Sequence, residues 1–130
     1  MTEHPRAAPD NDTEPFWAGC HEHALTLQQC DDCATYRFPP RPRCPSCRSD
    51  AVSWQQGSGN GTIASYTLCH PPVLPAFAER TPYNVIVVQL DEGPFIVSNL
   101  IDGAPEIGAR VSVTFTDIDD ELTLPQFTRS

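Results

Sequence analysis

Four cysteines in the first half of the chain constrain its fold more than any other feature. Cys30 and Cys33 form one C-x2-C pair, and Cys44 and Cys47 form a second pair after ten intervening residues. Each pair lies on a tight turn that lets two thiolates converge, and two such pairs complete the tetrahedral four-thiolate shell that Zn2+ prefers. The spacing therefore predicts a structural zinc ribbon, in which no coordination position is left open for a substrate.

Two other interpretations of the four cysteines stay open at this point. Two disulfides would use the same residues but require an oxidising compartment. Iron could occupy the same four-thiolate site in place of zinc. The remaining cysteines, Cys20 and Cys69, lie outside the ribbon, and we expect Cys20 to be semi-buried and Cys69 to be a small strand residue.

The overall composition narrows the class of protein. The chain has 130 residues, a formal net charge of −9 and a pI near 4.6. Acidity of this size argues against a general nucleic-acid binder, because phosphate contacts supply most non-specific affinity. Residues 1–14 are polar and proline-interrupted, which predicts a disordered tail rather than a signal peptide. The longest aliphatic run, residues 85–88, is too short to span a bilayer, so we expect a cytoplasmic protein that makes no use of a membrane.

The chain divides into three predicted parts, namely a tail (1–14), a helix with the zinc ribbon (15–56) and a β-domain (57–130). A short apolar helical turn is predicted at residues 14–17, and Gly19 is expected to end or weaken it. Strands are predicted at residues 25–29 and 52–55 of the ribbon. Residues 57–61 contain three glycines and predict a flexible turn at the boundary between the last two parts.

The last part of the chain has the pattern of a small barrel. Strands are predicted at residues 62–70, 83–90, 95–100, 110–116 and 122–127, with no strong helical pattern between them. Five short strands in about seventy residues favour a closed or nearly closed barrel, of which the OB-fold is the best-known example. The predicted fold class is therefore mainly β, with a short N-terminal helix, a zinc ribbon and a five-stranded OB-fold barrel.

The order of these parts resembles a known family, the small proteins that join a rubredoxin-like zinc ribbon to an OB-fold. The residues that carry the resemblance are Phe16 and Trp17, the four ribbon cysteines, and segments 38–41, 59–62, 65–67, 82–83, 98–100 and 122–127. The resemblance covers residues 16–127. It implies a non-catalytic accessory or scaffold subunit that binds a thiolase-like or aldolase enzyme of acyl-CoA metabolism, including steroid side-chain degradation, and helps to form its acyl-CoA channel.

Two other functions remain open alongside this one. The first is an acyl-CoA-binding module that works with an enoyl-CoA hydratase or a ketosynthase. The second is a nucleic-acid-binding zinc-ribbon protein, which would require more basic residues on the barrel than the three arginines that follow residue 60. No serine, histidine and aspartate constellation or phosphate loop indicates independent catalysis.

Several residues are candidates for contact with a partner enzyme or an acyl-CoA. Arginine suits phosphate or carboxylate recognition, although cations near a four-thiolate zinc centre also offset its negative charge. Exposed apolar side chains on a long loop suit a protein interface. The candidates are Phe16, Trp17, Arg37, Arg41, Val73, Leu74, Phe77 and Tyr83. His21 and His23 are not expected to form a second metal site, and residues 117–121 are expected to form a solvated acidic turn.

Overall fold

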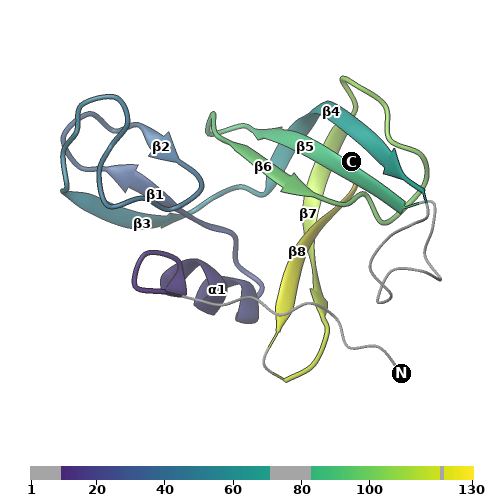
Figure 1. Ribbon diagram of the computed structural model, residues 1–130, viewed down its shortest axis with the longest axis horizontal. Coiled ribbons are helices and arrows are strands. Elements are labelled where there is room, and N and C mark those ends of the chain that lie inside the picture. Colours follow the sequence, from purple (N-terminus) through teal and green to yellow (C-terminus); the bar gives the residue numbers. More distant parts are fainter. Residues whose placement is uncertain (1–9, 71–82, 121) are drawn as a thin grey trace.

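The computed structural model describes residues 10–70, 83–120 and 122–130, and places them in two β-sheets with one helix (Figure 1). The elements are α1 (Glu14–His21), β1 (Thr26–Cys30), β2 (Tyr36–Arg37), β3 (Val52–Gln56), β4 (Asn60–Cys69), β5 (Tyr83–Leu90), β6 (Phe95–Ser98), β7 (Arg110–Asp117) and β8 (Thr123–Arg129). The predicted mainly β fold with a short N-terminal helix is confirmed.

The smaller sheet belongs to the zinc ribbon. Its strand order is β2-β1-β3, and both pairings are antiparallel. Gln28 on the central strand lies opposite Arg37 on one side and Trp54 on the other. The strands predicted at residues 25–29 and 52–55 are therefore present, each within one residue of its predicted bounds.

The larger sheet has the order β6-β5-β4-β7-β8 and curls into a barrel. A register shift between Ile63 and Ser65 places a bulge in β4, and such bulges bend and twist a strand. The segment that follows β6 meets β8 through an isolated parallel bridge between Leu100 and Phe127. All five predicted strands are found, and their ends differ from the predicted ones by at most two residues.

The helix α1 is longer than the sequence indicates. It begins after a turn in which the Asp10 carboxylate accepts hydrogen bonds from the backbone N–H groups of Asp12 and Thr13, both at 2.9 Å. It then continues through Gly19 to His21. Glycine is needed there for packing, because a Cβ at position 19 would lie 2.7 Å from the Thr26 hydroxyl oxygen. Among the described residues, no helix is long and apolar enough to cross a membrane.

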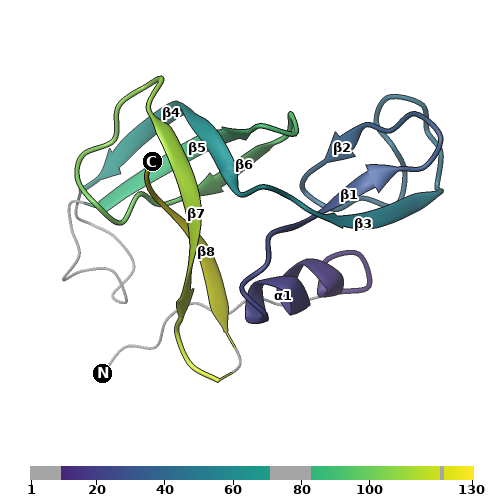
Figure 2. The ribbon, with the colours of Figure 1, turned by 180° about the vertical axis from the view of Figure 1, so that it is seen from behind.

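The ribbon, the helix and the barrel share one hydrophobic core. The helix lies beside β1 and beside the end of β8 that projects from the barrel (Figures 1 and 2). The buried cluster consists of Phe16, Cys20, Leu25, Leu27, Ile63, Ile86, Val88, Leu90, Ile96, Leu100, Val111 and Phe127. The partly buried Trp54 of β3 packs against the same cluster. Cys20 is completely buried rather than semi-buried, and burial raises the pKa of its thiol to about 12.

The glycine-rich segment between ribbon and barrel is held in place. The N–H of Gly57 donates to the Leu25 carbonyl at 2.7 Å, and the N–H of Ser58 donates to the Glu92 carboxylate at 2.8 Å. Gly59 has a φ of +80°, and a Cβ there would lie 2.4 Å from a methyl carbon of Val113. The segment predicted as a flexible turn therefore makes hydrogen bonds to both the ribbon and the barrel, and Gly59 is closely packed.

Candidate metal centre and apolar pocket

The four ribbon cysteines converge on one point. The sulfur atoms of Cys30 and Cys47 are 3.5 Å apart, those of Cys33 and Cys44 are 3.6 Å apart, and all four lie within 4.8 Å of one another. A tetrahedral zinc site with Zn–S bonds of about 2.3 Å requires sulfur atoms roughly 3.8 Å apart. The residues present therefore fit a four-thiolate metal ion, with Cys30 and Cys44 buried and the other two exposed.

Two matching turns bring the cysteines together. In the first, the N–H of Ala34 donates to the Cys30 carbonyl at 2.9 Å, and in the second the N–H of Arg48 donates to the Cys44 carbonyl at 2.8 Å. Ala34 and Arg48 have φ values of 65° and 66°, the left-handed conformation that reverses the chain after each pair. The N–H of Ser46 also points to the Cys44 sulfur at 3.4 Å. The local backbone thus directs the four sulfur atoms to one point.

The neighbours of these thiols shift their pKa values in opposite directions. The Thr35 hydroxyl lies 3.2 Å from the Cys33 sulfur and lowers the pKa of that thiol to about 6. A hydrogen bond from the backbone N–H of Ser49 lowers the pKa of the Cys47 thiol. The neighbouring thiols, Cys30 foremost, have the opposite and larger effect, and they raise that pKa to about 12. Four thiolates at this spacing repel one another, and a bound dication removes that penalty as the last proton leaves.

The disulfide interpretation is not what the structure shows. All six cysteines are free, and each sulfur of the cluster lies near all of the other three rather than near one bonded partner. With four protein ligands, the ion has no open position for substrate. The centre is therefore structural, and it fixes the turns that flank the proline-rich segment between the two cysteine pairs.

Arg37 joins this proline-rich segment to the ribbon sheet. It is only 3% exposed, and its Nε donates to the Gln28 side-chain oxygen at 2.7 Å while its Nη2 donates to the Arg41 carbonyl at 2.8 Å. Its Nη1 is buried with no hydrogen-bond partner among the described residues. Arg37 and Arg41 both line a cavity of about 290 Å³ that also contacts Phe95 of the barrel. Their predicted role in binding an anion or a partner stays a prediction.

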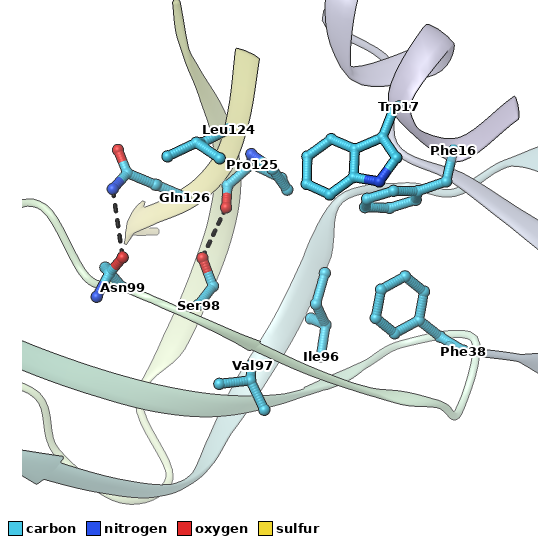
Figure 3. Close-up of a pocket in the computed structure, with 10 residues that line it drawn as sticks. All are labelled: Phe16, Trp17, Phe38, Ile96, Val97, Ser98, Asn99, Leu124, Pro125 and Gln126. Atoms are coloured by element: carbon cyan, nitrogen blue, oxygen red, sulfur yellow. Dashed lines mark hydrogen bonds between the residues drawn. The ribbon is translucent and has the colours of Figure 1, made fainter. Parts of the chain in front are cut away.

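A second, mostly apolar pocket lies where the helix, the ribbon and the barrel meet (Figure 3). It has a volume of about 260 Å³. Its lining residues are Phe16, Trp17, Phe38, Ile96, Val97, Ser98, Asn99, Leu124, Pro125 and Gln126. The ring of Phe16 lies 5.2 Å from that of Trp17 and 5.1 Å from that of Phe38, so three aromatic rings form one wall.

The polar side chains of this pocket hydrogen-bond within the barrel. The Ser98 hydroxyl donates to the Pro125 carbonyl at 2.7 Å, and the Gln126 amide donates to the Asn99 side-chain oxygen at 3.4 Å (Figure 3). None of the lining residues is a histidine, cysteine, carboxylate or lysine. The pocket can therefore hold apolar groups, but its lining supplies no general acid or base.

Of the predicted interface residues that the structure describes, Phe16 and Trp17 line the apolar pocket, whereas Arg37, Arg41 and Tyr83 do not. Tyr83 begins β5 opposite Cys69, and the hydrogen bond to the Cys69 thiol raises the pKa of its phenol. Val73, Leu74 and Phe77 lie outside the described residues. The lining residues from β6 and β8 are not among the sequence-predicted interface residues, although some of them fall in segments 98–100 and 122–127, which carry the family resemblance.

His23 makes its contacts with the β7–β8 hairpin. His23 Nε2 lies 3.0 Å from the Asp117 carboxylate, and its ring stacks on Phe115 at 5.4 Å. The Thr123 hydroxyl donates to the same carboxylate at 2.7 Å, and the Thr123 and His23 contacts lower the pKa of Asp117. Asp117 therefore fastens the turn after α1 to the end of the β7–β8 hairpin.

Comparison with known proteins agrees with this architecture. Family models match the ChsH2 rubredoxin-like zinc ribbon domain over residues 17–53 and the ChsH2 C-terminal OB-fold domain over residues 54–116. A solved chain of the Ltp2–ChsH2(DUF35) aldolase is 38% identical and superposes with a TM-score of 0.87, covering 95% of this chain and 98% of that chain.

Two curated relatives extend the comparison. A probable enoyl-CoA hydratase alpha subunit of Thermomonospora curvata is 39% identical over 126 residues, which are 95% of this chain but 39% of the relative. The chain thus spans about two fifths of the length of that relative. A DUF35 domain-containing scaffold protein of Methanothermobacter thermautotrophicus is 35% identical over 101 residues, which are 75% of each chain. With its ChsH2-type zinc ribbon and OB-fold, the chain therefore belongs to the DUF35 family.

Proposed function

We propose that this protein is a non-catalytic accessory subunit that binds a thiolase-like or aldolase enzyme of acyl-CoA metabolism and helps to form its acyl-CoA channel. The observation that carries the proposal is the near-complete match to the ChsH2(DUF35) chain of an aldolase. That match spans the ribbon, the helix and the barrel together, so each of these parts has a counterpart in that aldolase. The scaffold protein among the relatives supports the same role.

The chemistry of the described residues supports a role without independent catalysis. The metal centre has four protein ligands and leaves no position at which a substrate could be polarised. The apolar pocket is lined by aromatic, aliphatic, amide and hydroxyl side chains, and its Ser98 hydroxyl is engaged by a backbone carbonyl. A serine nucleophile would need an adjacent base, and the pocket lining contains none.

The apolar pocket is the described region best suited to a partner. Aromatic residues in a concave, apolar site are typical anchors of protein interfaces. Phe16 and Trp17 are the sequence-predicted interface residues that line it. The apolar residues of segment 71–82 remain a sequence-based proposal for a second part of the same interface.

The test uses Ltp2, the protein named together with ChsH2 in the matched aldolase, as the partner. Purified chain and purified Ltp2 are mixed and separated by size-exclusion chromatography, and we expect them to co-elute. The chain alone is expected to show no aldol cleavage, thiolysis or hydration of acyl-CoA substrates. Turnover that tracks the concentration of the isolated chain, or the absence of any complex, would contradict the proposal.

A matched pair of variants locates the interface. Leu124 lines the apolar pocket, whereas Ile107 is an exposed aliphatic residue that is not part of its lining. Burial of a leucine side chain is worth about 1.5–3 kcal/mol, so Leu124→Asp should weaken the complex by roughly 10- to 150-fold. Ile107→Asp should bind as the wild type does. Equal affinities for all three proteins would move the interface away from this pocket.

A hydratase-associated role is the second candidate, and the hydratase alpha subunit among the relatives favours it. In that case the chain would bind acyl-CoA or a hydratase component rather than an aldolase. Titration of the isolated chain with an acyl-CoA separates the two, because only a binding module should retain the ligand without a partner enzyme. A nucleic-acid role has the least support, since the net charge of −9 opposes phosphate binding.

We further propose that the ribbon ion is Zn2+ and that the protein works in a compartment that keeps thiols reduced, such as the cytoplasm. The four cluster cysteines form no disulfide, which supports metal binding by thiolates and a reducing compartment. Metal analysis of freshly purified protein distinguishes zinc from iron, and a red, iron-containing protein would overturn the zinc assignment.

A further inference from the structure

The seam that closes the barrel, between β6 and β8, is hydrogen-bonded over only part of its length. The Phe127 N–H donates to the Asn99 carbonyl at 2.9 Å, and the Ile101 N–H donates to the Phe127 carbonyl at 2.9 Å. These two bonds form the parallel bridge centred on Leu100 and Phe127. Figure 3 shows the two strands diverging beyond this point, with Phe16 and Trp17 of α1 facing the opening.

A proline keeps the seam from reaching Val97. In the parallel register set by Leu100 and Phe127, the next two bonds would run from the Asn99 N–H to the Pro125 carbonyl and from the N–H of residue 125 to the Val97 carbonyl, and the structure contains neither among the described residues. Residue 125 is proline, which has no backbone N–H and cannot donate the second of these bonds. The Pro125 carbonyl instead accepts a hydrogen bond from the Ser98 hydroxyl at 2.7 Å. Strand β8 therefore leaves the Val97 carbonyl without a donor.

The backbone of Val97 also points away from its other neighbour, β5. The N–H of Leu90 donates to the Pro94 carbonyl at 2.9 Å, which marks these residues as a hydrogen-bonded pair. Pairs of this type recur at every second residue, so Ile96 and Ser98 direct their backbone groups to β5. The N–H and C=O of Val97 consequently face the open edge, and Val97 is 66% exposed. No other strand among the described residues pairs with this edge at Val97, and an open strand edge is a template for another strand.

The apolar pocket lies beside this open edge. In Figure 3, Ile96 points toward the ring of Phe16 while Val97 points to the opposite face of β6. The pocket volume of about 260 Å³ is below the roughly 300–1,000 Å³ typical of small-molecule sites. A space of that size suits a single apolar side chain, held between the aromatic wall and Pro125.

We propose that the open edge of β6 at Val97 accepts an extended segment of the partner enzyme as an added strand. One apolar side chain of that segment would occupy the pocket formed by Phe16, Trp17 and Ile96. The proposal rests on the proposed function, because it requires a protein partner. An extended peptide supplies both things that this region lacks, namely backbone donors and acceptors for Val97 and an apolar group for the pocket.

Two other occupants fit the region less well. A hydrocarbon chain could fill the pocket, but it has no donor or acceptor to offer Val97. A second copy of this chain could pair edge to edge, but each copy carries a net charge of −9, and like charges oppose association. A segment from a different protein meets neither objection.

The experiment compares two variants of Val97 in complexes with Ltp2. Val97→Pro removes the outward N–H but no hydrogen bond to β5, and proline is tolerated on a strand edge whose N–H faces solvent. Val97→Thr keeps the backbone N–H and is the matched control. We expect Val97→Pro to bind Ltp2 about tenfold or more weakly and Val97→Thr to bind as the wild type does. Thermal unfolding of each free variant checks that the barrel is intact.

Amide hydrogen exchange of the wild-type chain gives a second measurement that needs no substitution. In the free chain, the Val97 amide should exchange faster than the amides of Ile96 and Ser98, which face β5. Complex formation with Ltp2 should slow exchange at Val97 at least tenfold. This measurement decides the question if Val97→Pro does not fold.

Each remaining outcome overturns one claim. If wild-type chain and Ltp2 form no complex, the proposed function fails. If they form one in which the Val97 amide stays unprotected, or folded Val97→Pro binds normally, the function stands and strand addition is wrong. Protection of Val97 by an acyl-CoA alone would assign the edge to that ligand. A dimer of the free chain that Val97→Pro disperses would assign it to a second copy.

Discussion

Replacement of Phe16 by alanine tests whether the ribbon and the barrel form one cooperative unit. The Phe16 side chain is 3% exposed and belongs to the buried cluster that contains residues of the helix, the ribbon and the barrel. Its ring also contacts those of Trp17 and Phe38. Truncation therefore removes buried area and leaves a cavity where the three parts meet, which costs about 3–5 kcal/mol.

Urea unfolding measures this loss. With a slope of about 2 kcal/mol per molar urea, the midpoint should fall by roughly 1.5–2.5 M. Intrinsic fluorescence of Trp17 and Trp54 follows the helix and the ribbon, while circular dichroism follows the β-structure of the whole chain. Zinc is kept at the same concentration throughout, because bound metal shifts the equilibrium. Both signals should move together to the lower midpoint.

A matched substitution and two outcomes make the result decisive. Ile107 is 69% exposed, so Ile107→Ala should change the free energy of unfolding by less than about 0.5 kcal/mol. A loss below about 1 kcal/mol for Phe16→Ala would mean that the site is not core. A circular dichroism transition that stays at the wild-type midpoint while fluorescence shifts would refute a shared core.

Three further perturbations have defined outcomes. Cys33→Ser should abolish stoichiometric metal and unfold the ribbon, since structural zinc contributes on the order of 10–16 kcal/mol; full metal content by elemental analysis would contradict this. Gly61→Ala should lower stability by about 1–3 kcal/mol, because a Cβ would lie 2.7 Å from the Gln89 carbonyl oxygen; an unchanged melting temperature would exclude that clash. The bidentate contact of Arg110 lowers the pKa of Asp91 in the folded protein below its usual value of 3.8. The pair therefore stabilises the fold at pH values above 3.8, and this stabilisation is lost as the pH falls through the pKa of Asp91 in the folded protein. Asp91→Asn should therefore lose less stability than the wild type on acidification, and equal losses in acid titrations would show that the contact is not linked to pH.

The strands and the metal centre could be predicted because their signals are local. Short apolar runs bounded by turn residues mark the strands, and the paired cysteines of the ribbon mark their own turns. The length of α1 could not be predicted in this way. Gly19 is a poor helix former by itself, and only the approach of Thr26 from β1 explains why glycine is required within the helix.

The apolar pocket was harder to predict, because its walls come from four distant segments. Phe16 and Trp17 were candidates as aromatic residues, but nothing local to β6 or β8 shows that these strands approach α1. Pro125 did carry a usable signal, since proline within a strand indicates an edge. Arg37 shows the reverse case, because its burial against Gln28 depends on a pairing between strands that residue type alone does not reveal.

The packed glycines between ribbon and barrel have a practical consequence for anyone who divides this protein. A boundary at Gly57, where composition changes most sharply, would cut the bond to the Leu25 carbonyl and separate Leu27 from the chain it packs against. An excised barrel would also lose the Phe16 side chain from its core. The smallest unit worth expressing therefore begins before α1, at Asp10 or earlier, and carries the ribbon and barrel together.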